Sequence, residues 1–152
     1  MRDGANLMFE RLKKIFGIHR TGDSGGRGEK LAADWLRRER GFTVVARNWR
    51  SPRDRRDEID LVCRDGEVLV FVEVKARAAG ALVPGFYAVN ARKKRVLLRA
   101  CRAYLARLSV QPRTYRLDVV EIVHPAADAV GAAAPEVLHF ENVPLFPKNF
   151  RG

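Results

Sequence analysis

The spacing of apolar residues along the chain predicts two helices and five strands. Apolar side chains recur at helical spacing in residues 26–40, and Gly41 follows as the usual residue just beyond a helix end. A second helix is predicted over residues 88–108, with an apolar stripe that begins at Leu97. Short segments rich in β-branched and aromatic residues predict strands over residues 42–49, 58–64, 67–77, 114–123 and 136–140.

The third predicted strand carries apolar residues on both of its faces. Val70 and Val72 lie on one face, and Leu69 and Phe71 lie on the other, because side chains alternate along a strand. A strand of this kind is central and covered on both sides. The order of elements is αβββαβ followed by a short edge strand. It predicts an α/β fold with a mixed central sheet flanked by helices.

The length of the chain, 152 residues, is that of a single domain with a substantial core. We expect this domain to occupy residues 25–140. Residues 1–24 are predicted to form an N-terminal extension, with a basic amphipathic helix in residues 7–16 and a flexible glycine-rich end. Residues 141–152 are predicted to form a C-terminal tail.

The net charge is the most informative feature of the composition. Lys and Arg number 29 against 18 Asp and Glu, which gives a net charge of +11. Such a domain attracts polyanions, of which nucleic acid is the commonest, and an anionic membrane surface is the alternative. No apolar run approaches the roughly 20 residues of a transmembrane segment, and we expect no secretory signal in residues 1–20.

The cysteines and the absence of a targeting signal predict a cytoplasmic protein. Cys63 and Cys101 have neither metal-ligand nor redox spacing, and we expect both to be reduced thiols of the core. A homodimer is compatible with the sequence, which carries no signature that requires one.

Two acidic residues stand in strands where apolar side chains would be usual. They are Asp60 and Glu73, and Asp65-Gly66 between them is typical of a two-residue hairpin turn. That turn would pair Asp60 with Phe71 and make Glu73 its diagonal neighbour on the same face, about 7–8 Å away at the backbone. Lys75 follows on the same face. A strand-end acid is more often paired with an arginine, but two acids and a lysine on one face favour a phosphodiesterase site.

The residue types suit that chemistry. Mg²⁺ is commonly held by one or two carboxylates together with water and substrate phosphate. A nearby lysine can position the attacking water, stabilise developing charge or act as a base. His19, His124 and His139 are scattered without ligand spacing, and no sequence supports a serine nucleophile.

Further charged residues lie on the two predicted helices. Glu29 shares the inward side of the first helix, where it lies either at the rim or towards a site. Lys93 lies at the edge of the apolar face of the second helix. The opposite side of that helix carries Arg92, Arg95, Arg99 and Arg102, a stripe that by itself indicates a solvated face.

Several of these residues belong to motifs that resemble a known family. The chain contains, in order, Gly28-Glu29-x2-Ala32, Glu58-Ile59-Asp60-Leu61, Phe71-Val72-Glu73-Val74-Lys75-Ala76-Arg77, Lys93 and Arg116-Leu117-Asp118-Val119-Val120. Together they resemble the YraN-like uncharacterised bacterial proteins over roughly residues 25–123. That family is placed in the restriction-endonuclease-like PD-(D/E)XK nuclease superfamily, and the resemblance therefore implies a restriction-endonuclease-like core.

The resemblance also implies roles for individual residues. Asp60 and Glu73 would bind metal, Lys75 would handle the nucleophile, and Glu29 would contribute from the first helix, as in archaeal Holliday-junction resolvases. Arg116 and Asp118 are expected to support the site indirectly or to be structural. The family usually has Gly before Glu58, whereas this chain has Asp57, which bears on the bend that enters the strand.

We therefore expect a Mg²⁺- or Mn²⁺-dependent nuclease acting on DNA, branched or damaged forms included. The alternative is a catalytically inactive nucleic-acid-binding module of a repair or uptake complex. A third interpretation is a membrane-surface protein tethered by residues 7–18. The predicted phosphate contacts are Arg50, Arg53, Arg55, Arg56, Arg77 and Lys93.

Overall fold

The computed structural model describes residues 24–80, 89–126, 131 and 133–152. The helix predicted within residues 7–16, and the predicted extension up to residue 23, lie outside the described residues. No helix in the described part is long and apolar enough to cross a membrane. The described elements are α2 (Ser24–Arg40), β1 (Thr43–Arg50), β2 (Glu58–Asp65), β3 (Val68–Ala78), α3 (Ala91–Leu105), β4 (Thr114–His124) and β5 (Glu136–Phe140).

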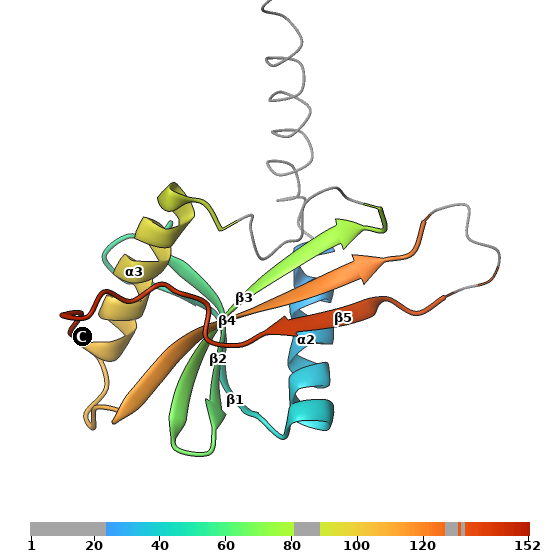
Figure 1. The fold of residues 1–152 in the computed structure, drawn as a ribbon. Helices are drawn as coiled ribbons and strands as arrows, with labels where there is room; N and C mark the ends of the chain where they lie inside the picture. Colours follow the sequence, from blue (N-terminus) through green and yellow to red (C-terminus); the bar gives the residue numbers. More distant parts are fainter. Residues whose placement is uncertain (1–23, 81–88, 127–130, 132) are drawn as a thin grey trace, which may run out of the picture.

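The strands form one mixed sheet in the order β1-β2-β3-β4-β5 (Figure 1). β3 and β4 are parallel, and the other neighbouring pairs are antiparallel. The chain passes through α3 between β3 and β4, since parallel neighbours need a long connection. The prediction of an α/β fold with an αβββαβ order is confirmed, and the architecture is consistent with a restriction-endonuclease-like core.

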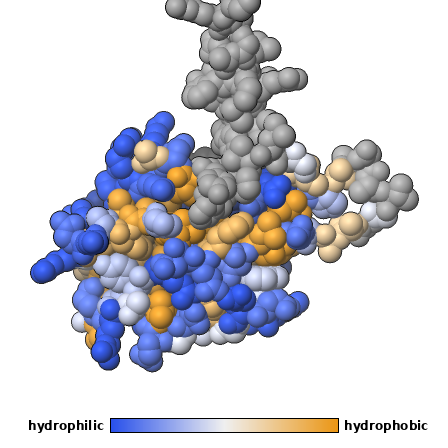
Figure 2. All heavy atoms as spheres, in the orientation of Figure 1, coloured by the Kyte–Doolittle hydropathy of each residue, from blue (hydrophilic) through white to orange (hydrophobic). Residues whose placement is uncertain are grey.

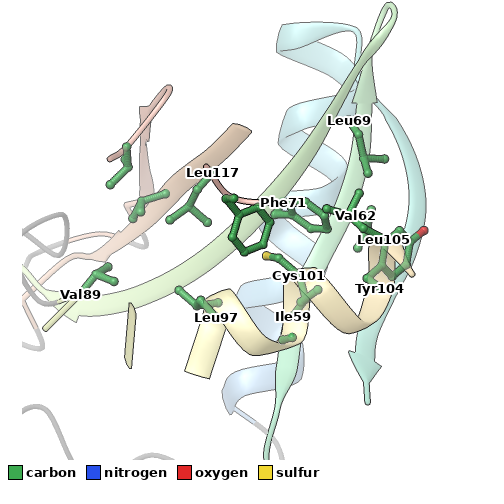
Figure 3. Close-up of a cluster of buried hydrophobic side chains, with 14 residues drawn as sticks. Ile59, Val62, Leu69, Phe71, Val89, Leu97, Cys101, Tyr104, Leu105 and Leu117 are labelled. Carbon is green, nitrogen blue, oxygen red and sulfur yellow. The ribbon is translucent and has the colours of Figure 1, made fainter. Parts of the chain in front are cut away.

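The central strand β3 is covered on both faces, as predicted. Leu69 and Phe71 pack in a cluster with α3 and the C-terminal residues, and Figure 3 shows Phe71 among side chains of α3. Val70 and Val72 pack with α2 on the opposite face. Truncating a fully buried side chain such as Phe71 to alanine would cost about 3–5 kcal/mol of stability.

Both cysteines lie in these packed layers, as the sequence indicates. Cys101 belongs to the cluster under α3 and Cys63 to the cluster under α2. Neither forms a disulfide. Burial raises the pKa of Cys63 to about 12 and that of Cys101 well above its usual range, so both side chains are protonated core thiols.

In the hairpin between β2 and β3, each residue of β2 pairs with a residue two positions further along β3 than predicted. Asp65 pairs with Val68, so the turn residues are Gly66 and Glu67 rather than Asp65 and Gly66. Gly66 has φ +56°, whereas Glu67 is not at positive φ, and one glycine at the first central position is typical of a type II′ turn. Because the pairing moves by an even number of residues, the faces of both strands are unchanged.

The helix α3 begins later and ends earlier than predicted. Asn90 is its N-cap, and its side-chain oxygen accepts a hydrogen bond from the backbone N–H of Lys93 at 2.9 Å. Val89, which the pattern assigned to the helix, precedes the cap and is buried in the core. At the other end, the Gln111 side-chain amide donates to the carbonyl oxygen of Leu105 at 2.8 Å and satisfies the helix end.

The residues predicted as a C-terminal tail pack against the sheet. Val143 donates its backbone N–H to the Leu117 carbonyl at 2.7 Å and is buried. Phe150 is 8% exposed and lies in edge contact with Tyr115. The core therefore extends beyond residue 140.

Candidate functional site

Glu73 lies at the far end of the buried part of β3. Its carboxylate is 2% exposed, with Oε1 at 2.9 Å from Nζ of Lys75 and at 3.2 Å from Nζ of Lys93. Lys75 comes from the same strand face, as predicted, and Lys93 comes from the first turn of α3. Two ammonium groups therefore converge on one carboxylate oxygen.

Asp60 lies where the pairing between β2 and β3 ends. The last pair is Leu61 with Val72, and the Asp60 carboxylate accepts a hydrogen bond from the backbone N–H of Val74 at 2.8 Å. Burial and then repulsion from Glu73 raise the pKa of Asp60 well above its usual range, against the opposing effects of the Val74 N–H and Lys93. The Asp60 and Glu73 carboxyl groups thus lie close enough to repel each other when both are ionised.

Glu29 reaches the same region from α2. Burial raises its pKa, and repulsion from Glu58 and Glu73 acts in the same direction. A side-chain hydrogen bond from Asn48 and the charge of Arg47 oppose the rise. Glu29 is half-buried, and its charge acts on both Asp60 and Glu73, so it lies on the side of α2 that faces them.

Asn48 is a site residue that the sequence reasoning missed. It has φ +49°, a left-handed conformation that few residues other than Gly, Asn and Asp adopt readily. Next to it the strands change face: Leu61 packs with the α2 cluster, whereas Ile59, only two residues away, packs with the α3 cluster. Asp60 lies at this change of face, and this explains how it interacts with Glu29 of α2 and with Lys93 of α3.

Lys93 keeps its charge in this setting. Burial alone would lower its pKa, but attraction to Glu73 and Asp60 outweighs burial and raises the pKa instead. If Lys93 contacts a phosphate as predicted, it does so while its ammonium group is also paired with Glu73. We call Glu29, Asp60, Glu73, Lys75 and Lys93 the carboxylate–lysine cluster.

The donor set of the cluster fits a hard divalent cation. Oε2 of Glu73 and Oε2 of Glu29 are buried and have no hydrogen-bond partner in the described part of the chain. Within the same residues, no group of three or more His, Cys, Asp or Glu side chains is arranged to hold a metal ion. Two carboxylates suffice for Mg²⁺ or Mn²⁺ when water and phosphate complete the coordination, so Asp60 and Glu73 could hold it.

Glu121, a further buried carboxylate, was also missed. It is fully buried on β4, is the register partner of Lys75, and forms an ion pair with Arg77. Arg77, a predicted phosphate contact, is thus directed at Glu121. An acid within the apolar run 117–123 was the available signal, the same one that marked Asp60 and Glu73.

Nearby acidic residues form ion pairs with two arginines of the basic loop between β1 and β2. Arg56 forms an ion pair with Asp54 at 2.8 Å, and hydrogen bonds from Arg56 lower the pKa of Asp54 to about 2. Arg50 pairs with Glu58 at 3.2 Å. The remaining predicted phosphate contacts of this loop, Arg53 and Arg55, are exposed.

Asp57, the departure from the family pattern, joins this loop to α3. Its carboxylate accepts two hydrogen bonds from Arg99, at 2.7 and 3.1 Å. Asp57 is 6% exposed, so the pair is partly withdrawn from water. The entry to β2 is therefore held by a bidentate arginine contact.

Arg116 and Asp118 form a separate network at the other side of the sheet. Asp118 is fully buried and accepts hydrogen bonds from Arg116, from the backbone N–H of Asn142, and at 2.9 Å from His139. No contact between this network and Asp60 or Glu73 occurs in the described residues. Arg116 and Asp118 connect β4 to β5 and the following segment, which is a structural role.

The fold and the cluster define a class of protein: a mixed α/β domain in which buried and half-buried acids meet two half-buried lysines where the pairing of the central strands ends. Residues 28–122 match the family model described as uncharacterised protein family UPF0102. The chain belongs to this family, and the resemblance to YraN-like proteins is thereby confirmed.

Relatives of this family share much of the chain. A UPF0102 protein of Anaeromyxobacter dehalogenans is 42% identical over 125 residues, which cover 78% of this chain and 86% of the relative. One from Beutenbergia cavernae is 44% identical over 105 residues, covering 69% and 86%. One from Symbiobacterium thermophilum is 46% identical over 104 residues, covering 68% and 84%.

Proposed function

We propose that the protein is a metal-dependent nuclease that hydrolyses phosphodiester bonds in DNA, branched or damaged forms included. The observation that carries the proposal is the environment of Glu73. One oxygen of this buried carboxylate is held by Lys75 and Lys93, and the other has no partner in the described residues although Asp60 lies beside it. An unpartnered buried oxygen next to a second acid is a suitable place for a cation.

Each residue of the cluster would have a separate role in such a reaction. Asp60 and Glu73 would hold Mg²⁺ or Mn²⁺, which when bound polarises the phosphoryl oxygen and acidifies its water. Lys75 is 29% exposed, so its ammonium group can reach a substrate phosphate or orient the attacking water while it contacts Glu73. Glu29, with its raised pKa, is suited to take up and release a proton beside them.

The preference for nucleic acid rests on charge. The net charge of +11 favours a polyanionic partner, and exposed arginines of the loop 50–56 adjoin the strand that carries Asp60. DNA as the substrate, membership of the PD-(D/E)XK superfamily and a cytoplasmic location follow from the sequence resemblance and the composition, and are part of the proposal.

The test is nicking of supercoiled, linear and branched DNA by purified protein with Mg²⁺ or Mn²⁺. We expect Glu73→Gln and Lys75→Ala each to lower the rate by at least about 100-fold, the usual effect of removing one preorganised electrostatic partner. Glu67→Gln and Lys148→Ala, which change exposed residues away from the cluster, are the matched controls. Nicking that survives in both cluster variants at the parent rate would contradict the proposal.

A second candidate function is a nucleic-acid-binding module without catalysis, in a repair or uptake complex. The observation that favours it is that the Glu73 carboxylate already has two ammonium groups within 3.2 Å, so its charge is balanced without a cation. Metal-independent binding of DNA together with no turnover of any DNA form would favour this module over the nuclease.

A further inference from the structure

A cleft lined by arginines lies between the basic loop and the outer side of α3. Its volume is about 310 Å³, and Figure 2 shows hydrophilic residues gathered over the start of α3. We propose that this cleft binds a backbone phosphate of a nucleic-acid strand beside the carboxylate–lysine cluster. The nucleic-acid partner rests on the proposed function. The residues that line the cleft are Arg56, Arg92, Arg95, Val96 and Arg99.

The arginines come together from two elements. Arg92, Arg95 and Arg99 are spaced by three and four residues, so they lie on one side of α3. Arg56 is brought to them from the loop by the contact between Asp57 and Arg99. The sequence alone indicated a solvated arginine stripe. The loop turns that stripe into a concave surface.

Two of the arginines are held in place by acids. Arg99 uses Nε and one terminal nitrogen on Asp57, and Arg56 uses Nε and one terminal nitrogen on Asp54. Each guanidinium keeps its other terminal nitrogen, with two N–H donors, for a ligand. The loop is itself fixed, since Asp57 donates its backbone N–H to the Asp54 carbonyl at 3.0 Å.

The other two arginines give the cleft its net positive charge. Arg92 and Arg95 form no ion pair within the described residues and are exposed. The cleft therefore has four guanidinium groups against the two carboxylates of Asp54 and Asp57. A concave surface of one sign concentrates the potential that attracts an anion, and guanidinium matches the geometry of phosphate.

The residues of the cleft are neighbours of cluster residues along the chain, so a phosphate bound in the cleft is expected near the reacting bond. Arg92 directly precedes Lys93, whose Nζ is 3.2 Å from Glu73, and Asp57 lies three residues before Asp60 on the same strand entry. The volume exceeds the roughly 30 Å³ of one water molecule many times, so a phosphodiester with part of its sugar fits. Val96 supplies an apolar contact for the sugar.

The test compares two double variants with equal loss of charge. Arg92→Ala/Arg95→Ala removes cleft arginines, and Arg107→Ala/Arg113→Ala removes exposed arginines beyond the end of α3. Binding of a fluorescent oligonucleotide is measured without metal at several salt concentrations. We expect the cleft variant to bind about tenfold more weakly and to lower the salt slope by about 1–2, as for the loss of phosphate contacts. The control should stay within about twofold of the parent.

The outcomes separate this proposal from the nuclease. Equal affinities for the two double variants would overturn the cleft, whether or not the parent nicks DNA. Weaker binding by the cleft variant alone would support the cleft even if no DNA is nicked. Loss of binding to anionic phospholipid vesicles, with oligonucleotide affinity unchanged, would also overturn it and assign the cleft to a lipid headgroup. Thermal melting of each variant checks that it is folded.

Discussion

The charged form of Asp60 is disfavoured in the folded protein. It is placed beside Glu73, and its carboxyl group is surrounded by packed atoms although the residue as a whole is only partly buried. Its one hydrogen bond in the described residues comes from the Val74 backbone. A cation that bound both Asp60 and Glu73 would remove the repulsion between their carboxylates.

The raised pKa of Asp60 predicts a pH dependence of stability in metal-free protein. The folded state holds the Asp60 proton more tightly than the unfolded chain, so this contribution to stability is full at low pH. It is lost as pH rises from about 4 through the folded pKa. We expect Asp60→Asn to become more stable than the parent as pH rises, by at most about 1.4 kcal/mol per pH unit.

Urea unfolding in a chelator between pH 4.5 and 7.5 measures this difference. Asp34→Asn, at a partly exposed site on α2, controls for the loss of one negative charge. A difference between parent and Asp60→Asn that does not change with pH would contradict the placement of Asp60.

Metal binding gives a second prediction for the same residue. A ligand that binds only the folded state stabilises it, by about 2.7 kcal/mol at a concentration 100 times Kd. We expect Mg²⁺ or Mn²⁺ to raise the melting temperature of the parent and to leave Asp60→Asn unchanged, because the variant has lost one of the two anionic ligands. If neither ion changes the melting temperature of the parent, the result favours the nucleic-acid-binding module without catalysis.

At the scale of elements, the faces of the strands were predictable and the exact pairing was not. Both possible turns at Gly66 give the same alternation of faces along the paired residues of β2 and β3. Asp60 lies beyond the last pair, at the change of face between Ile59 and Leu61, so alternation alone did not fix its place beside Glu73. The turn type depends on whether one or two residues adopt positive φ, which Asp65-Gly66 does not decide. The change of face at Asn48 likewise depends on packing against both helices.

The start of α3 is an element boundary with consequences for the site. Asn90 caps the helix through the backbone N–H of Lys93, so the cap fixes the residue whose ammonium group contacts Glu73. We expect Asn90→Ala to lower the free energy of unfolding by about 1 kcal/mol, as for other lost N-caps. Asn90→Asp should retain most of the stability, since its carboxylate can accept the same bond.

Urea unfolding of the parent, Asn90→Ala and Asn90→Asp measures this effect. If Asn90→Ala is as stable as the parent, the hydrogen bond to Lys93 does not hold the helix start. Nicking assays on the same proteins would then report whether the Lys93 position depends on the cap.

The whole molecule brings the site together from both sides of one sheet. α2 supplies Glu29, α3 supplies Lys93, and the strands between them supply the remaining members of the cluster. The sequence placed Glu29 on the inward side of its helix and Lys93 at the edge of an apolar face, but their convergence is a property of the sheet. The Arg77–Glu121 pair could not be read from local pattern either, because it joins β3 to β4 across the parallel register.

The packed C-terminal residues give the last prediction, since they were expected to form a tail. Phe150 is 8% exposed and contacts Tyr115 and Phe146, and its carbonyl accepts a hydrogen bond from the Tyr115 hydroxyl at 3.2 Å. We expect Phe150→Ala to destabilise the fold by about 3 kcal/mol, the lower end for a buried aromatic, because the site is near the edge of the core. Lys148→Ala, an exposed neighbour, should change stability by less than about 0.5 kcal/mol. If urea unfolding gave both variants the stability of the parent, residues 141–152 would be a tail as predicted, and the core would end at residue 140.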